Sequence, residues 1–422
     1  MKVFGRIVVV VLVVVVFVVG FGGATLAFDI TQPSVSGSNT QVRFVVVPGD
    51  TTNSVAARLA KDGLIRNDIL FRLWTRYRHL DKGLEPGVYF LTPGMTMNQI
   101  ALRLQNGIPD QIVVTVPDPL RLTQYPGYIS GHGLNNFDSA AFLKTAKTAV
   151  LPDGTQLWKK YWFVEPPQTN VAYALEGYLY PDTYDFDASA TTTTVIQTML
   201  FTLMEQICPS LTGAPDQYIY TQAQCKAHAI NINGVNFFTS AEKAYSTTND
   251  TQALYDTLIV ASLTSREILS YKDAPGVATV YHNRYLDYLA RVNGTTSPGD
   301  TAGFMGSDPS AEYARDTDNP PGPNGKWWAP LADSGSKIDL GNPYNTEAPP
   351  SGSSATGNPG LPPGPIAAPV LPEITAAAAP MDESKFPNFY LYSDNCGNIH
   401  YYPDLNSFSA AIPSLNNVTC SK

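Results

Sequence analysis

Near its middle the sequence reads Leu175-Glu176-Gly177-Tyr178-Leu179-Tyr180-Pro181-Asp182-Thr183-Tyr184-Asp185-Phe186-Asp187. If the part from Glu176 to Tyr180 is an extended strand, Glu176, Tyr178 and Tyr180 share one face, because side chains alternate along a strand. We therefore predict a surface on which a carboxyl group stands beside two aromatic rings that stack on sugar faces. A half-buried aromatic strand with an incidental glutamate is the alternative.

The surroundings of Glu176 predict a carboxyl group that keeps its proton near neutral pH. Aromatic neighbours exclude water and disfavour the charged form, and nearby acids add like charge, so both effects raise the pKa. The acids concerned are Asp182, Asp185 and Asp187. A glutamic acid that stays protonated can act as a general acid.

The chain has 422 residues, enough for two or three domains with cores of their own. Its formal net charge of −9 argues against nucleic acid as a partner, because no excess of basic residues is present to attract phosphates. Charged residues make up only 15%, whereas Pro (34), Gly (32) and Tyr (23) are plentiful. This balance favours an extracytoplasmic protein with long loops.

An apolar segment follows two positive residues at the start of the chain. Lys2 and Arg6 precede an uncharged run over residues 7–28 that is dominated by Val, Leu and Phe. A helix that crosses a bilayer needs about 20 such residues, and its positive flank stays in the cytoplasm. We therefore predict that residues 1–28 are a transmembrane anchor in the cytoplasmic membrane, with the bulk of the chain on the extracytoplasmic side. The small residues of Ala24-Thr25-Leu26-Ala27 make a cleaved signal peptide the alternative.

Four cysteines fit an oxidising compartment. Cys208 and Cys225 lie close in the sequence, as do Cys396 and Cys420, so two local disulfides are the natural pairing, although four cysteines allow three pairings. The sequence has no Cys-x-x-Cys or histidine-rich spacing, and it predicts neither a metal site nor a cofactor.

Residues 41–111 are predicted to form a small module of two strands and two helices. A β-branched run over 42–47 predicts the first strand, and Thr51 or Thr52 can cap the helix that follows. A second helix is predicted from Asn67 to Tyr77, and a closing strand over 87–91. This order resembles a LysM-like module, a fold associated with N-acetylated glycans. A spacer that binds nothing is the alternative.

The predicted fold class is α+β. Residues 29–40 are rich in Ser, Gly and Thr and predict a flexible linker. Residues 112–422 predict one mixed α+β catalytic domain, with helices over 191–206 and 256–269 and an inserted loop over 208–235. Long Pro/Gly-rich loops are expected over 320–328 and 348–365, where such segments often line sites.

Six stretches resemble, in order, those of the YceG-like (MltG-type) endolytic murein transglycosylases. They are Leu175–Tyr184, Ala261–Glu267, Val280–Arg284, Ser307–Ser310, Pro343–Thr346 and Gly360–Ile366. Each stretch is short, and it is their common order, behind an apolar segment and a LysM-like module, that makes the resemblance specific. The chain departs from the family's usual Glu at Ser265, from its Gln at Gly306 and from an aromatic residue at Glu347.

The resemblance implies an enzyme that cleaves the β-1,4 bond between N-acetylmuramic acid and N-acetylglucosamine in the glycan strands of peptidoglycan. It implies that Glu176 acts as general acid and then base, leaving a 1,6-anhydro end. Glu267 is expected to tune Glu176 or to bind the acetamido group, and Asp308, Tyr344 and Asn345 to bind sugar hydroxyls. A membrane-anchored enzyme of this kind is expected to act on nascent strands beside the cell-wall synthases.

Two other functions stay open at this point. A muramidase would pair Glu176 with Glu267 or Asp308 around a water molecule and leave a reducing end. A catalytically silent scaffold would instead bind the wall through the LysM-like module.

Overall fold

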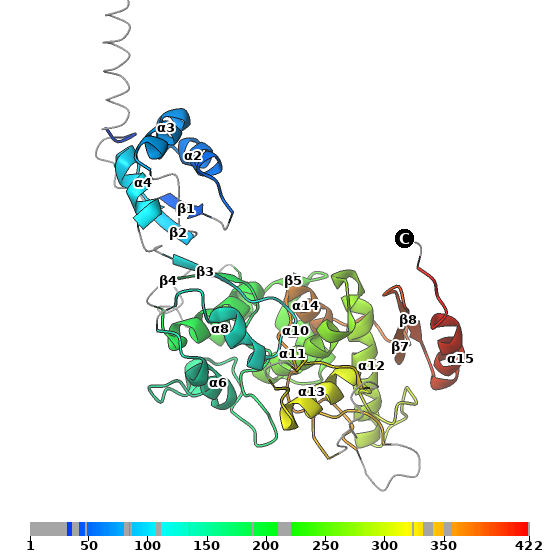
Figure 1. The fold of residues 1–422 in the computed structure, drawn as a ribbon. Helices are drawn as coiled ribbons and strands as arrows, with labels where there is room; N and C mark the ends of the chain where they lie inside the picture. Colours follow the sequence, from blue (N-terminus) through cyan, green and yellow to red (C-terminus); the bar gives the residue numbers. More distant parts are fainter. Residues whose placement is uncertain are drawn as a thin grey trace, which may run out of the picture. The chain divides into compact units, whose positions relative to one another are not determined.

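The computed structural model describes residues 32–420, apart from 36–41, 47–48, 80–83, 85–86, 107–110, 135, 188–189, 210–220, 323–324, 332–340 and 350–356. The predicted anchor (1–28) lies outside the described residues, as does most of the predicted linker. In the part of the chain that is described, no helix is both long enough and apolar enough to span a bilayer. The chain divides into two units, a smaller one built mainly from the N-terminal residues and a larger one built from the rest (Figure 1).

A four-stranded sheet in the order β1-β2-β3-β4 and the helices α2, α3 and α4 make up the smaller unit. Strands β1 and β2 are antiparallel, with Val42 opposite Leu91 and Val46 opposite Gly87. The first four elements follow the predicted order of strand, helix, helix and strand, but the prediction lacked α4 and β3. A LysM-like fold and glycan binding stay predictions. The elements are β1 Val42–Val46, α2 Thr52–Lys61, α3 Asp68–Tyr77, β2 Gly87–Leu91, α4 Met97–Asn106, β3 Gln111–Thr115 and β4 Thr183–Asp187.

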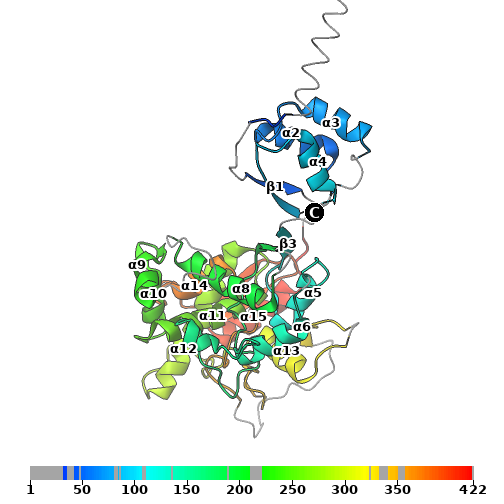
Figure 2. The same cartoon turned by 90° about the vertical axis from the view of Figure 1, so that its left-hand side faces the viewer.

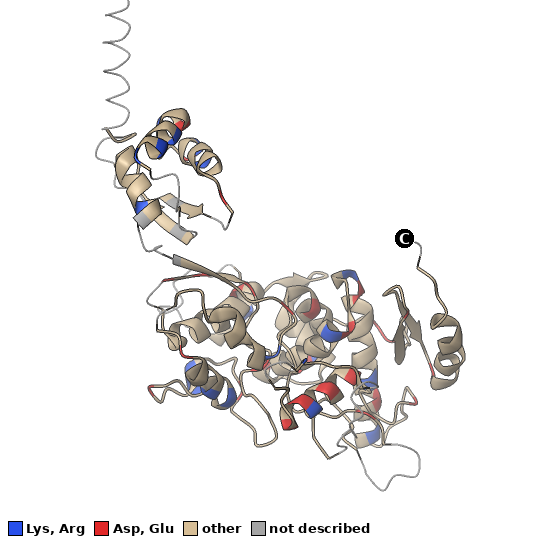
Figure 3. Cartoon of the chain, viewed as in Figure 1, with Lys and Arg blue, Asp and Glu red and all other residues tan. Residues whose placement is uncertain are grey.

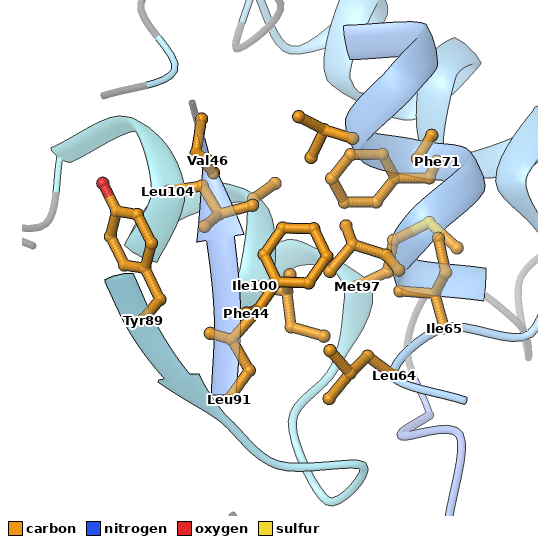
Figure 4. Packing of buried hydrophobic residues seen from close by; sticks show 14 residues of the cluster. Phe44, Val46, Leu64, Ile65, Phe71, Tyr89, Leu91, Met97, Ile100 and Leu104 are labelled. Carbon is orange, nitrogen blue, oxygen red and sulfur yellow. The ribbon is translucent and has the colours of Figure 1, made fainter. Parts of the chain in front are cut away.

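The core of the smaller unit follows from the spacing of its apolar residues (Figure 4). Alternate residues of the strands are buried, as a period of two requires, and so are residues three or four apart in the helices. The buried side chains include Phe44 and Val46 of β1, Tyr89 and Leu91 of β2, Val55 and Leu59 of α2, and Ile100 and Leu104 of α4.

Helix α3 begins after an N-cap at Asn67, whose Oδ1 accepts hydrogen bonds from the backbone N–H groups of Ile69 (2.9 Å) and Leu70 (3.1 Å). Loss of such a cap costs about 1 kcal/mol, so we expect Asn67→Ala to speed amide exchange in α3 roughly fivefold. Hydrogen-exchange mass spectrometry on peptides from α3 measures this rate. Asn67→Asp keeps the cap and serves as the control, and unchanged protection in Asn67→Ala would contradict the assignment.

Two later segments of the chain belong to the smaller unit, Gly131–Asn135 and Thr183–Ala190. The second contains β4, which is the neighbour of β3 in the sheet. A continuous boundary after residue 111, as the sequence suggested, therefore does not separate the two units. The physical reason is that β3 has a second edge whose backbone groups need a partner, and β4 supplies it.

The larger unit is mostly helical (Figures 1 and 2). Its central helix is α11, Asp250–Glu267, which is buried on nearly all sides from Ala253 to Ser265 and has α10, α12, α13 and α14 packed against it. Burial on nearly all sides is typical of a core helix, and the buried hydroxyl groups of α11 donate to carbonyl groups of its own backbone. The predicted helices over 191–206 and 256–269 are confirmed as α8 and α11, although α11 starts earlier, at an Asn249 cap.

The remaining elements of the larger unit are η1 Leu122–Gln124, α5 Tyr125–Ile129, α6 Ser139–Thr148, α7 Leu157–Lys160, α8 Thr192–Ile207, α9 Gln222–His228, β5 Asn231–Ile232, β6 Val235–Asn236, α10 Phe237–Ala244, η2 Tyr271–Asp273, α12 Ala274–Val292, α13 Asp308–Asp318, α14 Leu371–Ala378, β7 Tyr390–Ser393, β8 Ile399–Tyr402 and α15 Leu405–Leu415. The described residues between α13 and α14 form loops, as their Pro/Gly-rich composition predicts.

Both natural disulfide pairings are confirmed, Cys208 with Cys225 and Cys396 with Cys420. The inserted loop expected over 208–235 is wrong for its described part, which holds α9 and the β5–β6 hairpin. The hairpin turns at Asn233-Gly234, where both residues have positive φ. Asn-Gly is the preferred pair for such a tight turn, and this local signal outweighs the polar composition of the segment.

Candidate active site

The stretch around Glu176 is a tight turn and not the predicted strand. The backbone N–H of Tyr178 donates to the Leu175 carbonyl (3.1 Å), and Gly177 has a φ of 80°. A positive φ of this size favours glycine and interrupts any strand. A Cβ atom added to Gly177 would lie 2.6 Å from Cβ of Pro365, so the turn packs directly on the Gly360–Ile366 loop. The predicted alternation of Glu176, Tyr178 and Tyr180 on one face is therefore wrong.

Glu176 has no exposed surface, and both of its carboxyl oxygens accept hydrogen bonds. Oε1 accepts from the backbone N–H of Leu122 (2.9 Å), and Oε2 accepts from the Tyr313 hydroxyl (3.0 Å). Burial raises the pKa of Glu176 to about 8, against the opposing effects of Arg121 and of these two hydrogen bonds. At neutral pH the group is thus mostly protonated and fixed in orientation, which suits a general acid.

The charged groups around Glu176 differ from those that the sequence suggested. Burial raises the pKa of Glu176, and the Arg121 charge and the hydrogen bonds from Leu122 and Tyr313 lower it. Two of those acids, Asp185 and Asp187, lie in β4 of the smaller unit. The predicted direction of the shift is confirmed, and its largest cause is the loss of water on burial.

Arg121 is the residue of this site that sequence reasoning missed. Its side chain is completely buried, and its guanidinium carbon lies 4.3 Å from the centre of the Tyr313 ring and 4.4 Å from that of Trp327. Its Nη2 donates to Oγ1 of Thr317 (2.7 Å). An arginine in a Pro-rich segment carries no local signal for this role, because only the fold brings Tyr313 and Trp327 onto it.

Trp328 connects this buried cation to the end of helix α11. Its ring centre lies 5.8 Å from the guanidinium carbon of Arg121 and 4.2 Å from that of Arg266. Its indole N–H donates to Oε1 of Gln124 (3.3 Å), and its backbone N–H to Oδ2 of Asp316 (2.8 Å). Trp328 is half-buried, as is Arg266, whereas Arg121 is completely buried.

Two cavities adjoin the last turn of α11. Glu267 lines a cavity of about 660 Å³, together with Asp308 and Glu347. Ser265, two positions earlier, lines another of about 440 Å³. Arg266 stands between them in the sequence and contacts Trp328. Consecutive residues of one helix end thus reach both cavities and the aromatic cover over Arg121.

The larger cavity brings together two of the predicted site residues, Glu267 and Asp308, and one that the prediction left out, Glu347. The Tyr281 hydroxyl donates to Oε1 of Glu267 (2.8 Å), and burial raises the pKa of Glu267. Burial, and then the neighbouring Asp308, raises the pKa of Glu347 to about 7. Acids also gather along α13, which begins with Asp308 (Figure 3). The cavity therefore offers carboxyl acceptors to hydroxyl or amide groups, and one of its acids, Glu347, is partly protonated at neutral pH.

Other predicted site residues are buried and serve the local structure. Tyr178 stacks on Tyr255 with ring centres 6.0 Å apart, and the Tyr180 hydroxyl accepts from the backbone N–H of Leu371 (3.1 Å). This structure leaves neither ring a face that is open to a sugar, in contrast to the stacking surface that the sequence suggested. Extended geometry was the basis of that suggestion, and the turn at Gly177 removes it.

Tyr344 and Asn345 lie in a buried turn. The Tyr344 ring centre is 4.8 Å from that of Tyr313, so Tyr344 supports the tyrosine that binds Glu176. Oδ1 of Asn345 accepts from the backbone N–H of Glu347 (3.1 Å), which places Glu347 at the larger cavity. Within the described ranges, no group of three or more His, Cys, Asp or Glu side chains is arranged to hold a metal ion.

Residues 44–413 match the model of the YceG-like family. The endolytic murein transglycosylase of Bacillus subtilis (strain 168) is 24% identical over 277 residues, covering 62% of this chain and 64% of the relative. The protein of the same name from Streptococcus pneumoniae serotype 2 is 22% identical over 394 residues, covering 91% of this chain and 60% of the relative. The chain thus spans less than two thirds of the length of these curated relatives.

A crystal structure of a YceG-like protein from Listeria monocytogenes has a similar fold. The match has a TM-score of 0.51 at 19% sequence identity and covers 88% of this chain and 98% of that one. At this level of identity the likeness concerns the mixed α+β fold alone.

Proposed function

The chain belongs to the YceG-like family, and from that premise we propose that it is a lytic transglycosylase that cleaves the β-1,4 bond between N-acetylmuramic acid and N-acetylglucosamine in peptidoglycan. The observation that carries the proposal is Glu176, a buried carboxyl group held by two hydrogen bonds, whose pKa burial raises to about 8. The names of the curated relatives favour the same reaction.

One carboxyl group is enough for this reaction. Protonated Glu176 gives its proton to the glycosidic oxygen as the bond from that oxygen to C1 of N-acetylmuramic acid breaks. The resulting carboxylate takes the proton of the 6-hydroxyl of the same sugar, whose oxygen forms a new bond to C1. The product ends in a 1,6-anhydro ring and no water is consumed. The nucleophile belongs to the reacting sugar, so proximity lowers the barrier.

The contacts of Glu176 favour this reaction over hydrolysis. A hydrolase needs a second carboxyl group about 5 to 9.5 Å from the first. The polar groups that contact Glu176 are donors, Leu122 N–H and the Tyr313 hydroxyl, and the nearby charge is the cation Arg121. Glu267 and Asp308, the partners that a muramidase would use, line a cavity that Glu176 does not line. Their role in the proposal is to bind hydroxyl or acetamido groups of a sugar next to the cleaved bond.

The setting of the enzyme is also part of the proposal. The apolar run over residues 7–28 anchors the chain in the cytoplasmic membrane, and the bulk of the chain acts on the extracytoplasmic side. There the smaller unit binds glycan, and the larger unit cuts nascent strands beside the synthases that make them. The two disulfides support an oxidising compartment.

Mass spectrometry of purified peptidoglycan treated with the full chain in detergent tests the reaction. Anhydro-ended muropeptides are the expected product. New reducing ends would instead identify a muramidase. Glycan binding without new ends of either kind would favour the silent scaffold.

We expect the cleavage rate to fall as the pH rises through about 8, because the acid must be protonated and the pKa of Glu176 is about 8. Tyr313→Phe removes a hydrogen bond that favours the Glu176 carboxylate, so the pKa of Glu176 rises. The fall of the cleavage rate at high pH, the alkaline limb of the pH–rate profile, therefore moves to higher pH. Rates measured from pH 6 to 10 report the position of this limb. The control Tyr281→Phe removes the matching hydrogen bond to Glu267 and is expected to leave the limb in place. A limb that moves to lower pH in Tyr313→Phe would contradict the assignment.

A further inference from the structure

Arg121 is a buried cation with unused donors. Its side chain has no exposed surface, and its Nε and Nη1 atoms have no hydrogen-bond partner among the described residues. Only Nη2 is engaged, with Thr317. Buried polar groups are almost always hydrogen-bonded, and leaving a donor unpaired costs about 1–3 kcal/mol, more for a charged group. Two free donors on a buried guanidinium therefore indicate a partner that binds there.

The aromatic residues around Arg121 show where that partner enters. The Tyr313 ring on one side is fully buried, whereas Trp327 and Trp328 are half-buried. The two indole rings are thus the partly exposed neighbours of the Arg121 guanidinium. Glu176 has no exposed surface either, so a glycan reaches Arg121 or Glu176 only after side chains that cover them have moved.

We propose that the Trp327 and Trp328 rings leave Arg121 when a glycan binds, and that its free Nε–H and Nη1–H groups then donate to an acyl carbonyl oxygen of the sugar at the cleaved bond. This inference rests on the proposed function and deepens it. Arginine offers donors alone, and its hydrogen bonds to oxygen acceptors are charge-assisted. A peptidoglycan sugar carries such an oxygen on its acetamido group and, in N-acetylmuramic acid, also on its lactyl group.

The same position lets Arg121 act on Glu176. The groups that face the Glu176 carboxyl are Arg121, Tyr313, Tyr344 and Tyr173, and Arg121 is the cation among them. When Glu176 has given up its proton, the positive charge of Arg121 stabilises the carboxylate that remains. Removal of this charge therefore raises the pKa of Glu176 and moves the alkaline limb of the rate to higher pH.

Tryptophan fluorescence titrations test the binding step without turnover. The full chain carrying Glu176→Gln is titrated with chitotetraose, which has acetamido groups only, and with a tetrasaccharide of alternating N-acetylglucosamine and N-acetylmuramic acid. We expect both ligands to change the emission of Trp327 and Trp328, and added Arg121→Gln to weaken binding at least tenfold. Weakening for both ligands identifies the acetamido oxygen, and weakening for the muramic ligand alone identifies the lactyl oxygen.

Further variants keep the test decisive. Arg121→Lys keeps the charge, so the alkaline limb stays in place, whereas Arg121→Gln moves it upward, a difference that a merely structural role would not produce. Thr317→Val removes the hydrogen bond that orients the Arg121 guanidinium, so we expect it to weaken glycan binding severalfold. If Arg121→Gln does not fold, this variant tests the role of Arg121 in its place. Arg78→Gln is the matched control, because Arg78 also stacks on a tryptophan (Trp74, 5.4 Å) but lies in the smaller unit.

The outcomes separate this inference from the proposed function. A wild-type protein that produces anhydro ends, with normal glycan affinity in the Arg121 and Thr317 variants, overturns the role of Arg121 and leaves the function intact. A wild-type protein that binds neither ligand overturns both.

Discussion

Glu176→Gln is expected to reduce the release of anhydro-ended muropeptides by about a thousandfold, within the range of 10² to 10⁴ typical of a lost general acid. The amide has nearly the shape of the acid and can still accept from Leu122 N–H at its oxygen, but it has no proton to give. Muropeptides are quantified by mass spectrometry at pH 7, where the native group is mostly protonated. Because the fold is kept, glycan affinity should be close to that of the wild-type protein.

Asp256→Asn is the matched control for this result. Asp256 is also a carboxyl group in the larger unit whose pKa burial raises, to about 7, but its hydrogen bond goes to Gln252 (2.9 Å), away from Arg121 and Tyr313. Its replacement should leave the cleavage rate within about twofold, because asparagine has nearly the same shape and its Oδ1 can still accept the hydrogen bond from Gln252. Equal loss of activity in both variants would show that folding, and not chemistry, is what the Glu176 substitution disturbs.

Gly177→Ala is expected to destabilise the larger unit by about 3 kcal/mol, from a strained positive φ and from overpacking against Pro365. Its φ is 80°, and the added carbon would lie 2.6 Å from one side-chain atom of Pro365 and 2.7 Å from another. The proline ring is stiff, so the backbone of the turn has to move, and Glu176 moves with it. We therefore expect a lower midpoint in thermal unfolding together with a loss of cleavage at temperatures where the protein is still folded.

Gly127→Ala provides the comparison. Gly127 lies within α5, and nothing is within 4 Å of the added carbon, so the substitution should be neutral or stabilising by up to about 1 kcal/mol. If Gly177→Ala were as stable as Gly127→Ala, the tight turn around Glu176 would be in doubt, and so would the geometry of the acid.

Local patterns in the sequence predicted the parts of the fold that local physics fixes. The β-branched run after residue 42, the cap at Thr51 and the spacing of apolar residues in α11 each act over a few residues, and the predicted elements are present. The cysteine pairs are confirmed for the same reason, since each closes a short loop. Its aromatic neighbours and the family resemblance drew attention to Glu176, which the structure shows as a buried, hydrogen-bonded carboxyl group.

The parts that the sequence did not predict depend on contacts between distant segments. Gly177 in an aromatic run looks like a residue of a strand, and only its approach to Pro365 explains the turn. Arg121 acquires its role from Tyr313 and Trp327, about 200 positions further along the chain. No periodicity or propensity carries such information, so the aromatic cover of the site could not be predicted from the sequence.

Because β3 and β4 are neighbours in one sheet, the smaller unit cannot be exchanged by a single recombination point in the gene. A recombination that joins a new N-terminal module at residue 114 would separate β3 from its partner strand and leave an exposed edge, which invites aggregation. During synthesis the same order applies in time, because residues 115–182 must leave the ribosome before β4 does. The first unit to emerge is therefore completed only after the segment that carries Glu176 has been made, and the two units have to be exchanged, truncated or redesigned as one.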